Sequence, residues 1–418
     1  MEKFELDLTD DNIEETILKD YLDNNKKLYS LSHLVGNIDK NMTVCIDGDW
    51  GCGKTFFINQ FKYIIDHDEK HVEFKITEDI SKILKDIKEN NVIVYYDAWK
   101  NDNHIDTFQS IIYNILNEFP KYKNVITDFN NVKDLLIDFG KNIINKFSYE
   151  IIDFKNISTY DDLAKEIITM EEKREKFKEL LEKILGNKRM ILIIDELDRC
   201  NPMFASRVLE TVKHFYDIPN ITIIIVANNK ELTHTIKKQY GNEFDAYDYL
   251  NKFYNFIITL DNSRNIEYAQ KVLKFRNTTY LPHDVSYTMF KKYVFSYREC
   301  NMFRTMYNMA IDYIENNNLS GKHLIAFDII VPVIIAFKIK DIESYRECLN
   351  SDNIDALKEA LEYIKSSFEN GDIHRSWLKE LAHTDKEDEV EIILNIYKEF
   401  KSRGIYGDLF NDCIRMTL

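Results

Sequence analysis

Glycine and proline are scarce in this chain. Its 418 residues include eleven glycines and five prolines, which predicts short loops and many helices because both residues interrupt regular structure. Three of the glycines nevertheless fall within six positions, at Gly48, Gly51 and Gly53, in the stretch CIDGDWGCGKTFF over 45–57. Glycine is costly in regular backbone, so this cluster indicates a turn with unusual backbone angles or a close approach to a ligand.

Long apolar runs, paired cysteines and an excess of positive charge are also missing. The longest apolar stretch, FDIIVPVIIAF at 327–337, is too short to cross a bilayer and is predicted as a buried helix. The six cysteines form no C-x-x-C pair, and the acidic N-terminus does not resemble a signal peptide. These features predict a cytoplasmic protein with reduced thiols and no membrane span. The formal net charge of −16 argues against a surface coated by nucleic acid but leaves local binding open.

The distribution of apolar residues predicts an α/β fold with a parallel sheet, because continuous apolar runs indicate strands covered on both faces. Six strands are predicted, over 42–46, 71–76, 91–99, 189–195, 220–228 and 255–260. The pattern between 105 and about 187 is helical, so this long connection is predicted as a helical insertion. We expect three parts: N-terminal helices over 1–40, a core over 41–262, and an all-helical domain over 263–418.

The glycine cluster belongs to a G-x-x-x-x-G-K-T motif between a predicted strand and a helix predicted at 54–65. This context predicts a phosphate loop, in which glycines let backbone N–H groups and a helix N-terminus face phosphate oxygens. Lys54 would neutralise the β- and γ-phosphates, and the Thr55 hydroxyl would bind Mg²⁺. The alternative is a tight turn with an incidental Lys-Thr pair. The residues expected to contact the nucleotide are Gly48, Asp49, Trp50, Gly51, Cys52, Gly53, Lys54, Thr55 and Phe56.

A pair of acids follows the predicted strand in ILIIDELDRC at 191–200. A carboxylate at the end of an apolar strand is the usual second protein contact of the magnesium ion in such sites, so Asp195 is expected to hold Mg²⁺. Glu196 is then placed to polarise an attacking water as a general base. These acids could instead cap the strand and precede a helix that starts at Asn201-Pro202, and both interpretations can hold together.

Three further polar residues are candidates with an alternative open for each. Arg199 could stabilise charge at the γ-phosphate or pair with a neighbouring acid. Asn228 ends the apolar run at 220–228, where it could orient the water or cap the strand end. Arg298 in YRECNMFR could reach a phosphate from the helical domain, although sequence alone does not give the geometry. Lys54, Asp195, Glu196, Arg199 and Asn228 form the predicted catalytic set.

Together these stretches resemble the KAP family of P-loop NTPases. The matching stretches are GDWGCGKT at 48–55, YYDAWKND at 95–102, IIDELDRC at 193–200, YLNKFYNFIITL at 249–260 and YRECNMFRTMYN at 297–308. The resemblance spans roughly 30–310 and implies a parallel, ASCE-type P-loop core that binds ATP and Mg²⁺. Many relatives carry membrane helices between the two motifs, whereas this chain has a helical insertion without a span. Residues 310–418 resemble no family that we can name.

The predicted function is therefore an ATPase that couples hydrolysis to conformational switching, self-association or binding of a protein partner. ATP is preferred to GTP because no Asn-Lys-x-Asp motif follows a strand. The resemblance and the Lys-, Asn- and Ile-rich composition suggest a role in bacterial anti-phage defence. Two alternatives remain: a nucleotide-loaded switch or scaffold with little turnover, and a nucleic-acid-associated ATPase.

Overall fold

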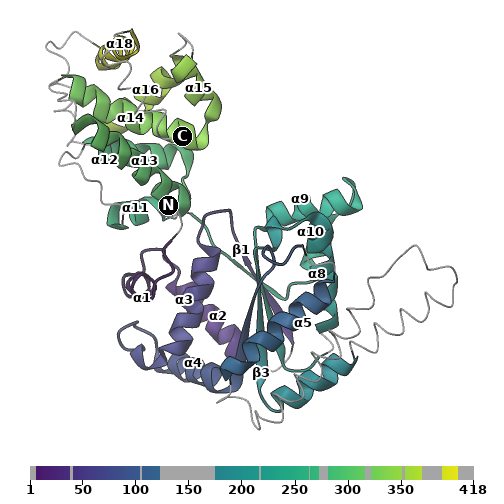
Figure 1. The fold of residues 1–418 in the computed structure, drawn as a ribbon. Helices are drawn as coiled ribbons and strands as arrows, with labels where there is room; N and C mark the ends of the chain where they lie inside the picture. The colour runs from purple at the N-terminus through teal and green to yellow at the C-terminus, as the bar shows by residue number, and fades with distance from the viewer. Residues whose placement is uncertain are drawn as a thin grey trace.

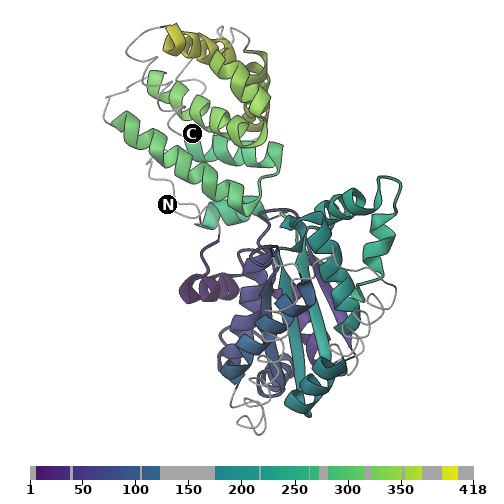
Figure 2. The ribbon, with the colours of Figure 1, turned by 45° about the vertical axis from the view of Figure 1, so that its right-hand side comes forward.

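The protein has an α/β lobe and a helical lobe (Figures 1 and 2). The computed structural model describes residues 6–37, 41–103, 106–122, 175–215, 218–262, 264–272, 281–315, 322–350, 354–369 and 388–402. Most of the insertion predicted at about 105–187 lies outside these residues. Its described parts are helical at 107–118 and 175–185, as the sequence predicts.

A five-stranded parallel sheet forms the centre of the α/β lobe, in the order β2-β3-β4-β1-β5. The strands are β1 (Met42–Asp47), β2 (Asn91–Asp97), β3 (Arg189–Asp195), β4 (Ile221–Ala227) and β5 (Phe256–Thr259). β4 lies between β1 and β3, which is the arrangement expected of an ASCE-type core. Because all the strands are parallel, the segments that follow β1, β3 and β4 meet at one edge of the sheet.

Alternating burial explains why both faces of this sheet are covered. In β3, Met190, Leu192 and Ile194 belong to one buried cluster, whereas Ile191 and Ile193 belong to the other. Successive side chains of a strand point to opposite faces, so a continuous apolar run requires helices on each side. The predicted parallel α/β core is confirmed.

Helices pack on both faces of the sheet, as Figure 1 shows. One face is covered by α1 (Asp10–Lys19), α2 (Asn25–Asn37), α3 (Lys54–Asp66) and α4 (Glu78–Asn90), with the short helix η1 (Asp68–Lys70) beside them. The other is covered by α5 (Thr107–Glu118), η2 (Phe119–Tyr122), η3 (Leu197–Arg199), α8 (Pro202–Phe215), α9 (Asn229–Tyr240) and α10 (Ala246–Asn251). The N-terminal helices therefore pack against the core.

The strand predicted at 71–76 is wrong. Its backbone bonds locally instead: the Phe74 N–H donates to the Lys70 carbonyl at 3.1 Å, and the Ile76 N–H donates to the His71 carbonyl at 2.9 Å. Lys75 between them has a left-handed φ of 55°. Phe74 and Ile76 are both buried, so the alternation that suggests a strand comes from two side chains that anchor a turn.

Every described element after β5 is a helix. The elements are α11 (Asn265–Val272), α12 (Leu281–Tyr293), α13 (Tyr297–Glu315), α14 (Lys322–Lys340), α15 (Ile342–Asn350), α16 (Asp355–Glu369) and α18 (Glu389–Ser402). α14 contains the apolar stretch 327–337 and is buried along that stretch, as predicted. Among the described helices, none is long and apolar enough to cross a membrane.

The three predicted parts share one buried cluster. Leu28 of α2, Phe57 of α3 and Phe303 of α13 all belong to it, so apolar packing continues from the N-terminal helices through the α/β lobe into the helical lobe. The boundaries proposed at 40 and 262 remain a prediction. What matters for the site is that the helical lobe contacts the loop after β1.

Candidate functional site

The glycine-rich loop joins β1 to α3 at the carboxyl edge of the sheet. Gly51 and Gly53 have φ of 82° and 89°, a left-handed conformation that strains any residue with a Cβ. A Cβ on Gly48 would lie 2.6 Å from the Leu260 carbonyl oxygen, so this position has no room for one. The loop ends at the N-terminus of α3, where unpaired N–H groups and the helix dipole favour an anion.

Lys54, the first residue of α3, folds back onto this loop. Its Nζ donates to the Gly48 carbonyl at 2.7 Å and to the Asp49 carbonyl at 3.2 Å. The ammonium group thus bonds to the loop's own carbonyl oxygens. A phosphate bound by the loop would compete with these two carbonyls for the lysine.

Asp195 ends β3 and collects three hydrogen bonds from different elements. Its Oδ2 accepts from Thr55 Oγ1 at 2.9 Å and from the Tyr95 hydroxyl at 2.8 Å, and its Oδ1 accepts from the Glu196 N–H at 2.8 Å. Burial raises the pKa of Asp195 above its usual range, although the bonds from Tyr95 and Thr55 act in the opposite direction. The structure therefore brings the predicted magnesium ligands, Thr55 and Asp195, into direct contact.

Tyr95 is a site residue that the sequence reasoning missed. It lies on β2 and pairs in register with Ile193, two residues before Asp195 on the neighbouring strand. The sequence does carry a signal for Tyr95. Tyr95 and Asp97 lie two positions apart on β2 and therefore share a face of the sheet, and Asp97 pairs in register with Asp195. Its hydroxyl helps to hold the Asp195 carboxylate toward Thr55.

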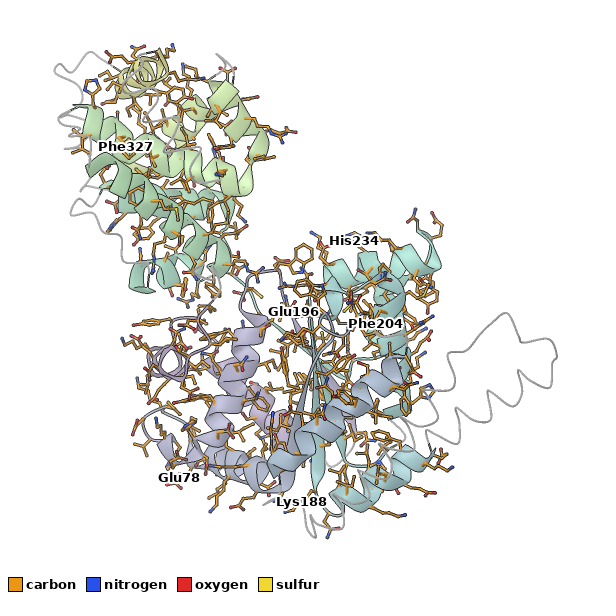
Figure 3. All side chains as sticks on the ribbon, in the orientation of Figure 1. Glu78, Lys188, Glu196, Phe204, His234 and Phe327 are labelled. Atoms are coloured by element: carbon orange, nitrogen blue, oxygen red, sulfur yellow. The ribbon has the colours of Figure 1, made fainter. Side chains whose placement is uncertain are left out.

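Glu196 follows β3 in a left-handed conformation, with φ of 62°. Its carboxylate forms an ion pair with Nε of Arg199, and the Arg199 guanidinium lies 5.4 Å from the centroid of the Trp99 ring. Burial, followed by the charge of Asp195, raises the pKa of Glu196 to about 7. In this structure Arg199 thus pairs with a neighbouring acid, which is the alternative to a role at the γ-phosphate. Figure 3 shows Glu196 at the end of the sheet opposite Lys188.

Asn228 caps α9 in this structure. Its side-chain oxygen accepts from the N–H groups of Lys230 at 3.1 Å and Glu231 at 3.3 Å. The alternative considered for Asn228 was a cap of the strand end; its oxygen instead caps the helix that follows the strand. Next to it, the Asn229 N–H donates to Oδ1 of Asp47 at 2.9 Å, which links the ends of β4 and β1.

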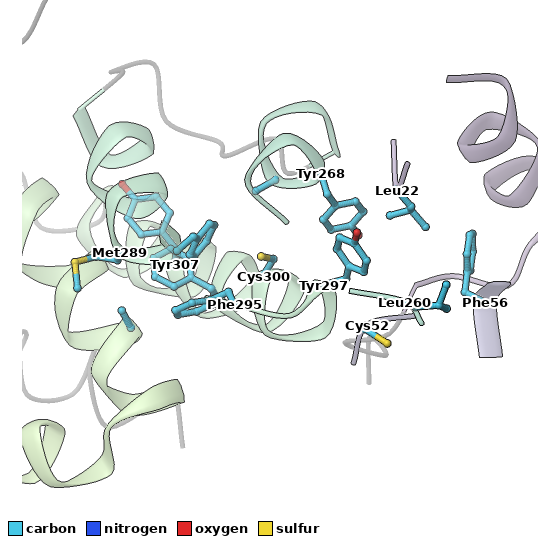
Figure 4. Packing of buried hydrophobic residues seen from close by; sticks show 14 of the residues in the cluster. Leu22, Cys52, Phe56, Leu260, Tyr268, Met289, Phe295, Tyr297, Cys300 and Tyr307 are labelled. Carbon is cyan, nitrogen blue, oxygen red and sulfur yellow. The ribbon is translucent and has the colours of Figure 1, made fainter. Parts of the chain in front are cut away.

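The start of α13 lies against the glycine-rich loop. The Arg298 N–H donates to the Gly51 carbonyl at 3.4 Å, and a Cβ on Gly51 would lie 2.7 Å from Ser296 Oγ. Tyr297 is buried in the same cluster as Cys52, Phe56 and Leu260 (Figure 4). The helical lobe therefore contacts the loop directly, and Arg298 stands at that contact.

A capping box fixes this end of α13. Oε2 of Glu299 accepts from the Ser296 N–H at 2.7 Å, and the Glu299 N–H donates to Ser296 Oγ at 3.3 Å. The same carboxylate forms an ion pair with Lys340 at 2.6 Å. The helix end that touches the loop is thus tied to the last residue of α14.

The donor atoms of the site fit magnesium and a triphosphate. A hydroxyl and a carboxylate are hard oxygen ligands, and Mg²⁺ commonly takes one or two of these from protein and the rest from phosphates and water. In the part of the chain that the structure describes, no group of three or more His, Cys, Asp and Glu side chains is arranged to hold a metal alone. The two oxygen ligands, Thr55 and Asp195, therefore fit a Mg²⁺ ion that is also coordinated by phosphates and water.

One family of known proteins matches this chain over most of its length. A model of the KAP family P-loop domain matches residues 22–310, which is more than half of the chain. Among solved structures, the Aeropyrum pernix ORC2 protein in its ADPNP and ADP complexes matches with 13% identity and a TM-score of 0.36, over 91% of this chain and 95% of that one. No curated protein matches significantly. With its phosphate loop after β1 and its acidic pair after β3, the chain belongs to the KAP family of P-loop NTPases.

Proposed function

We propose that this protein binds ATP with Mg²⁺, hydrolyses it, and uses the cycle to switch conformation or to assemble. One observation carries the proposal: Thr55 Oγ1 lies 2.9 Å from Asp195 Oδ2 although the residues are 140 positions apart. This contact joins the start of α3 to the end of β3, which is the geometry that a shared magnesium ligand pair requires. Lys54 and Glu196 lie beside it in sequence and at the same sheet edge.

Thr55 and Asp195 would hold the metal, and Mg²⁺ when bound supplies positive charge to the phosphate oxygens. The N–H groups of the loop and of the first turn of α3 bind the phosphates. Lys54 leaves the Gly48 and Asp49 carbonyls and contacts the β- and γ-phosphates. This exchange replaces two neutral acceptors by charged ones, which favours the nucleotide-bound state.

Glu196 accepts the proton of the water that attacks the γ-phosphate in line. Its ion pair with Arg199 engages Oε2 of this carboxylate, and when the pair opens the released guanidinium can stabilise the phosphate charge. Arg298 approaches from the helical lobe and is a second candidate for that role. The side-chain nitrogen of Asn228 can still donate to the water, because only its oxygen is engaged in capping α9.

A second function is favoured by the same ion pair. If the Arg199–Glu196 pair persists when nucleotide is bound, the carboxylate stays away from water and the protein acts as a nucleotide-loaded switch or scaffold with little turnover. The two functions share the binding site and differ only in the release of phosphate.

Purified protein tests both. We expect wild-type protein to bind ATP–Mg²⁺ in preference to GTP and to release phosphate, and Lys54→Ala to lose binding. Binding without phosphate release supports the switch, and absence of binding at millimolar nucleotide overturns both functions. Repeating the assay with DNA, RNA or cell lysate shows whether an additive stimulates turnover, which would identify the class of partner. A phage challenge of cells with wild-type protein or Lys54→Ala tests the proposed defence role.

A further inference from the structure

Trp50 lies at the tip of the phosphate loop, in a turn closed by the Cys52 N–H donating to the Asp49 carbonyl at 3.2 Å. Its side chain is 51% exposed. The indole Nε1 nevertheless donates to Oδ2 of Asp198 at 2.5 Å, a contact between residues 148 positions apart. The half-exposed Trp50 indole of the loop thus hydrogen-bonds to a carboxylate in the turn after β3.

Asp198 is buried, with 6% of its surface exposed. Its position is fixed by η3, because the neighbouring Leu197 is fully buried and the Cys200 N–H donates to the Leu197 carbonyl at 3.4 Å. No described residue hydrogen-bonds its Oδ1. Burying a carboxylate with one oxygen unpaired costs free energy that an apolar side chain would not. Packing alone therefore does not account for an acid at this position.

The loop tip is held from two sides. Trp50 is bonded to Asp198 of the α/β lobe, and the next residue, Gly51, accepts from the Arg298 N–H of the helical lobe at 3.4 Å. Loop tips without such contacts are among the most mobile parts of a protein. These two bonds fix the tip relative to both the acidic turn and α13.

We propose that Asp198 is a positioning residue, which holds the phosphate loop through Trp50 at a fixed place relative to the turn that carries Glu196. The bond lets the loop amides and the acidic pair face the same phosphate before nucleotide arrives, so that less ordering is needed on binding. Asp198 acts through Trp50, from whose indole N–H it accepts. This inference rests on the proposed function, since it concerns the same site.

Nucleotide affinity of four variants tests the inference. Trp50→Phe keeps an aromatic ring but loses the N–H, Asp198→Ala loses the acceptor, and Asp198→Asn keeps an acceptor oxygen without the charge. We expect Trp50→Phe and Asp198→Ala each to weaken ATP–Mg²⁺ binding about tenfold, the scale of one hydrogen bond to a charged group. The double variant should be no weaker than either single one, because both remove the same bond. Asp198→Asn should retain most of the wild-type affinity.

Trp99→Phe is the matched control, because Trp99 is 52% exposed at the same sheet edge and contacts Arg199 through a ring face that Phe retains. We expect it to bind ATP–Mg²⁺ as wild-type protein does. Wild-type affinity in Trp50→Phe, or additive losses in the double variant, overturn the inference. Trp50→Phe changes a half-exposed side chain and so stays informative even if Asp198→Ala fails to fold. Wild-type protein that binds no nucleotide overturns the proposed function instead, before the variants are compared.

Discussion

Two turns at the same edge of the sheet both contain residues in the left-handed backbone conformation, but different types of residue occupy these positions. The loop after β1 places glycines, Gly51 and Gly53, at its left-handed positions, whereas the turn after β3 places Glu196 there. Glycine takes this conformation without strain, but a residue with a Cβ raises the free energy of the folded state by roughly 1–2 kcal/mol. The phosphate loop therefore depends on its backbone conformation, whereas the acidic turn depends on the carboxylate of one side chain.

Strain in a non-glycine residue is typical of sites where a side chain must point in one direction. In the acidic turn, that direction brings the Glu196 carboxylate to Arg199 and its N–H to Asp195. The phosphate loop shows the converse, since its glycines supply the backbone conformation while its side chains Trp50 and Cys52 contact protein. A Cβ added to the phosphate loop should therefore introduce backbone strain, whereas glycine in place of Glu196 should relieve it.

The largest expected effect is on turnover in Glu196→Gln. The amide cannot accept a proton from water, so phosphate release should fall by about 10²- to 10⁴-fold, the usual contribution of a general base. Nucleotide binding should persist, because the loop and Lys54 are untouched. Single-turnover hydrolysis beside a binding titration measures both quantities. Measurable turnover that is unchanged in Glu196→Gln would show that Glu196 is not the base, whereas negligible phosphate release in both proteins would favour the switch.

A methyl group on the loop should have the next largest effect. In Gly51→Ala the new Cβ combines a left-handed φ with a contact of 2.7 Å to Ser296 Oγ. We expect at least about a tenfold loss of ATP affinity, since the added strain and crowding together exceed the 1.4 kcal/mol that a factor of ten represents.

Gly186→Ala is the control for that substitution. Gly186 also has a positive φ, of 54°, but a Cβ there meets no atom within 4 Å. It should lower stability by about 1 kcal/mol and leave nucleotide binding unchanged. Equal losses of affinity in the two variants would mean that general destabilisation, and not the geometry of the loop, controls binding.

The smallest effect concerns the stability of the acidic turn. Glu196→Gly and Glu196→Ala both remove the carboxylate, but only glycine relieves the left-handed backbone. We expect the free energy of unfolding to be about 1 kcal/mol higher in Glu196→Gly than in Glu196→Ala, as measured by chemical denaturation. If the two variants are equally stable, the turn relaxes without strain and the contrast with the glycine loop disappears.

Much of this architecture could be predicted from residue patterns. β1, β3 and β4 are continuous apolar runs ended by a polar residue, and the motif after each strand places functional groups at one sheet edge. The failure at 71–76 has a local cause, because Phe74 and Ile76 bury alternate side chains while Lys75 turns the backbone. The periodicity of apolar residues indicates which side chains are buried, but it does not indicate which carbonyl oxygen each backbone N–H bonds to.

The finer geometry of the site depends on choices that sequence spacing leaves open. Arg199 had several acids in reach and pairs with Glu196, and Asn228 caps α9 with its oxygen. The Trp50–Asp198 bond joins positions that only the order of the strands brings together. Neither partner carries a sequence signal for the other, so this contact could be found only from the fold.

The ion pair between Glu299 and Lys340 has a mechanical consequence. α14 has 19 residues and therefore extends about 28 Å, with one end fastened beside the phosphate loop through the start of α13. A tilt of roughly 5° about that fastening would displace the far end, at Lys322, by about 2.5 Å. α14 thus connects the Glu299 carboxylate beside the loop to the other end of the helix, so a small tilt at Lys340 becomes a larger displacement at Lys322.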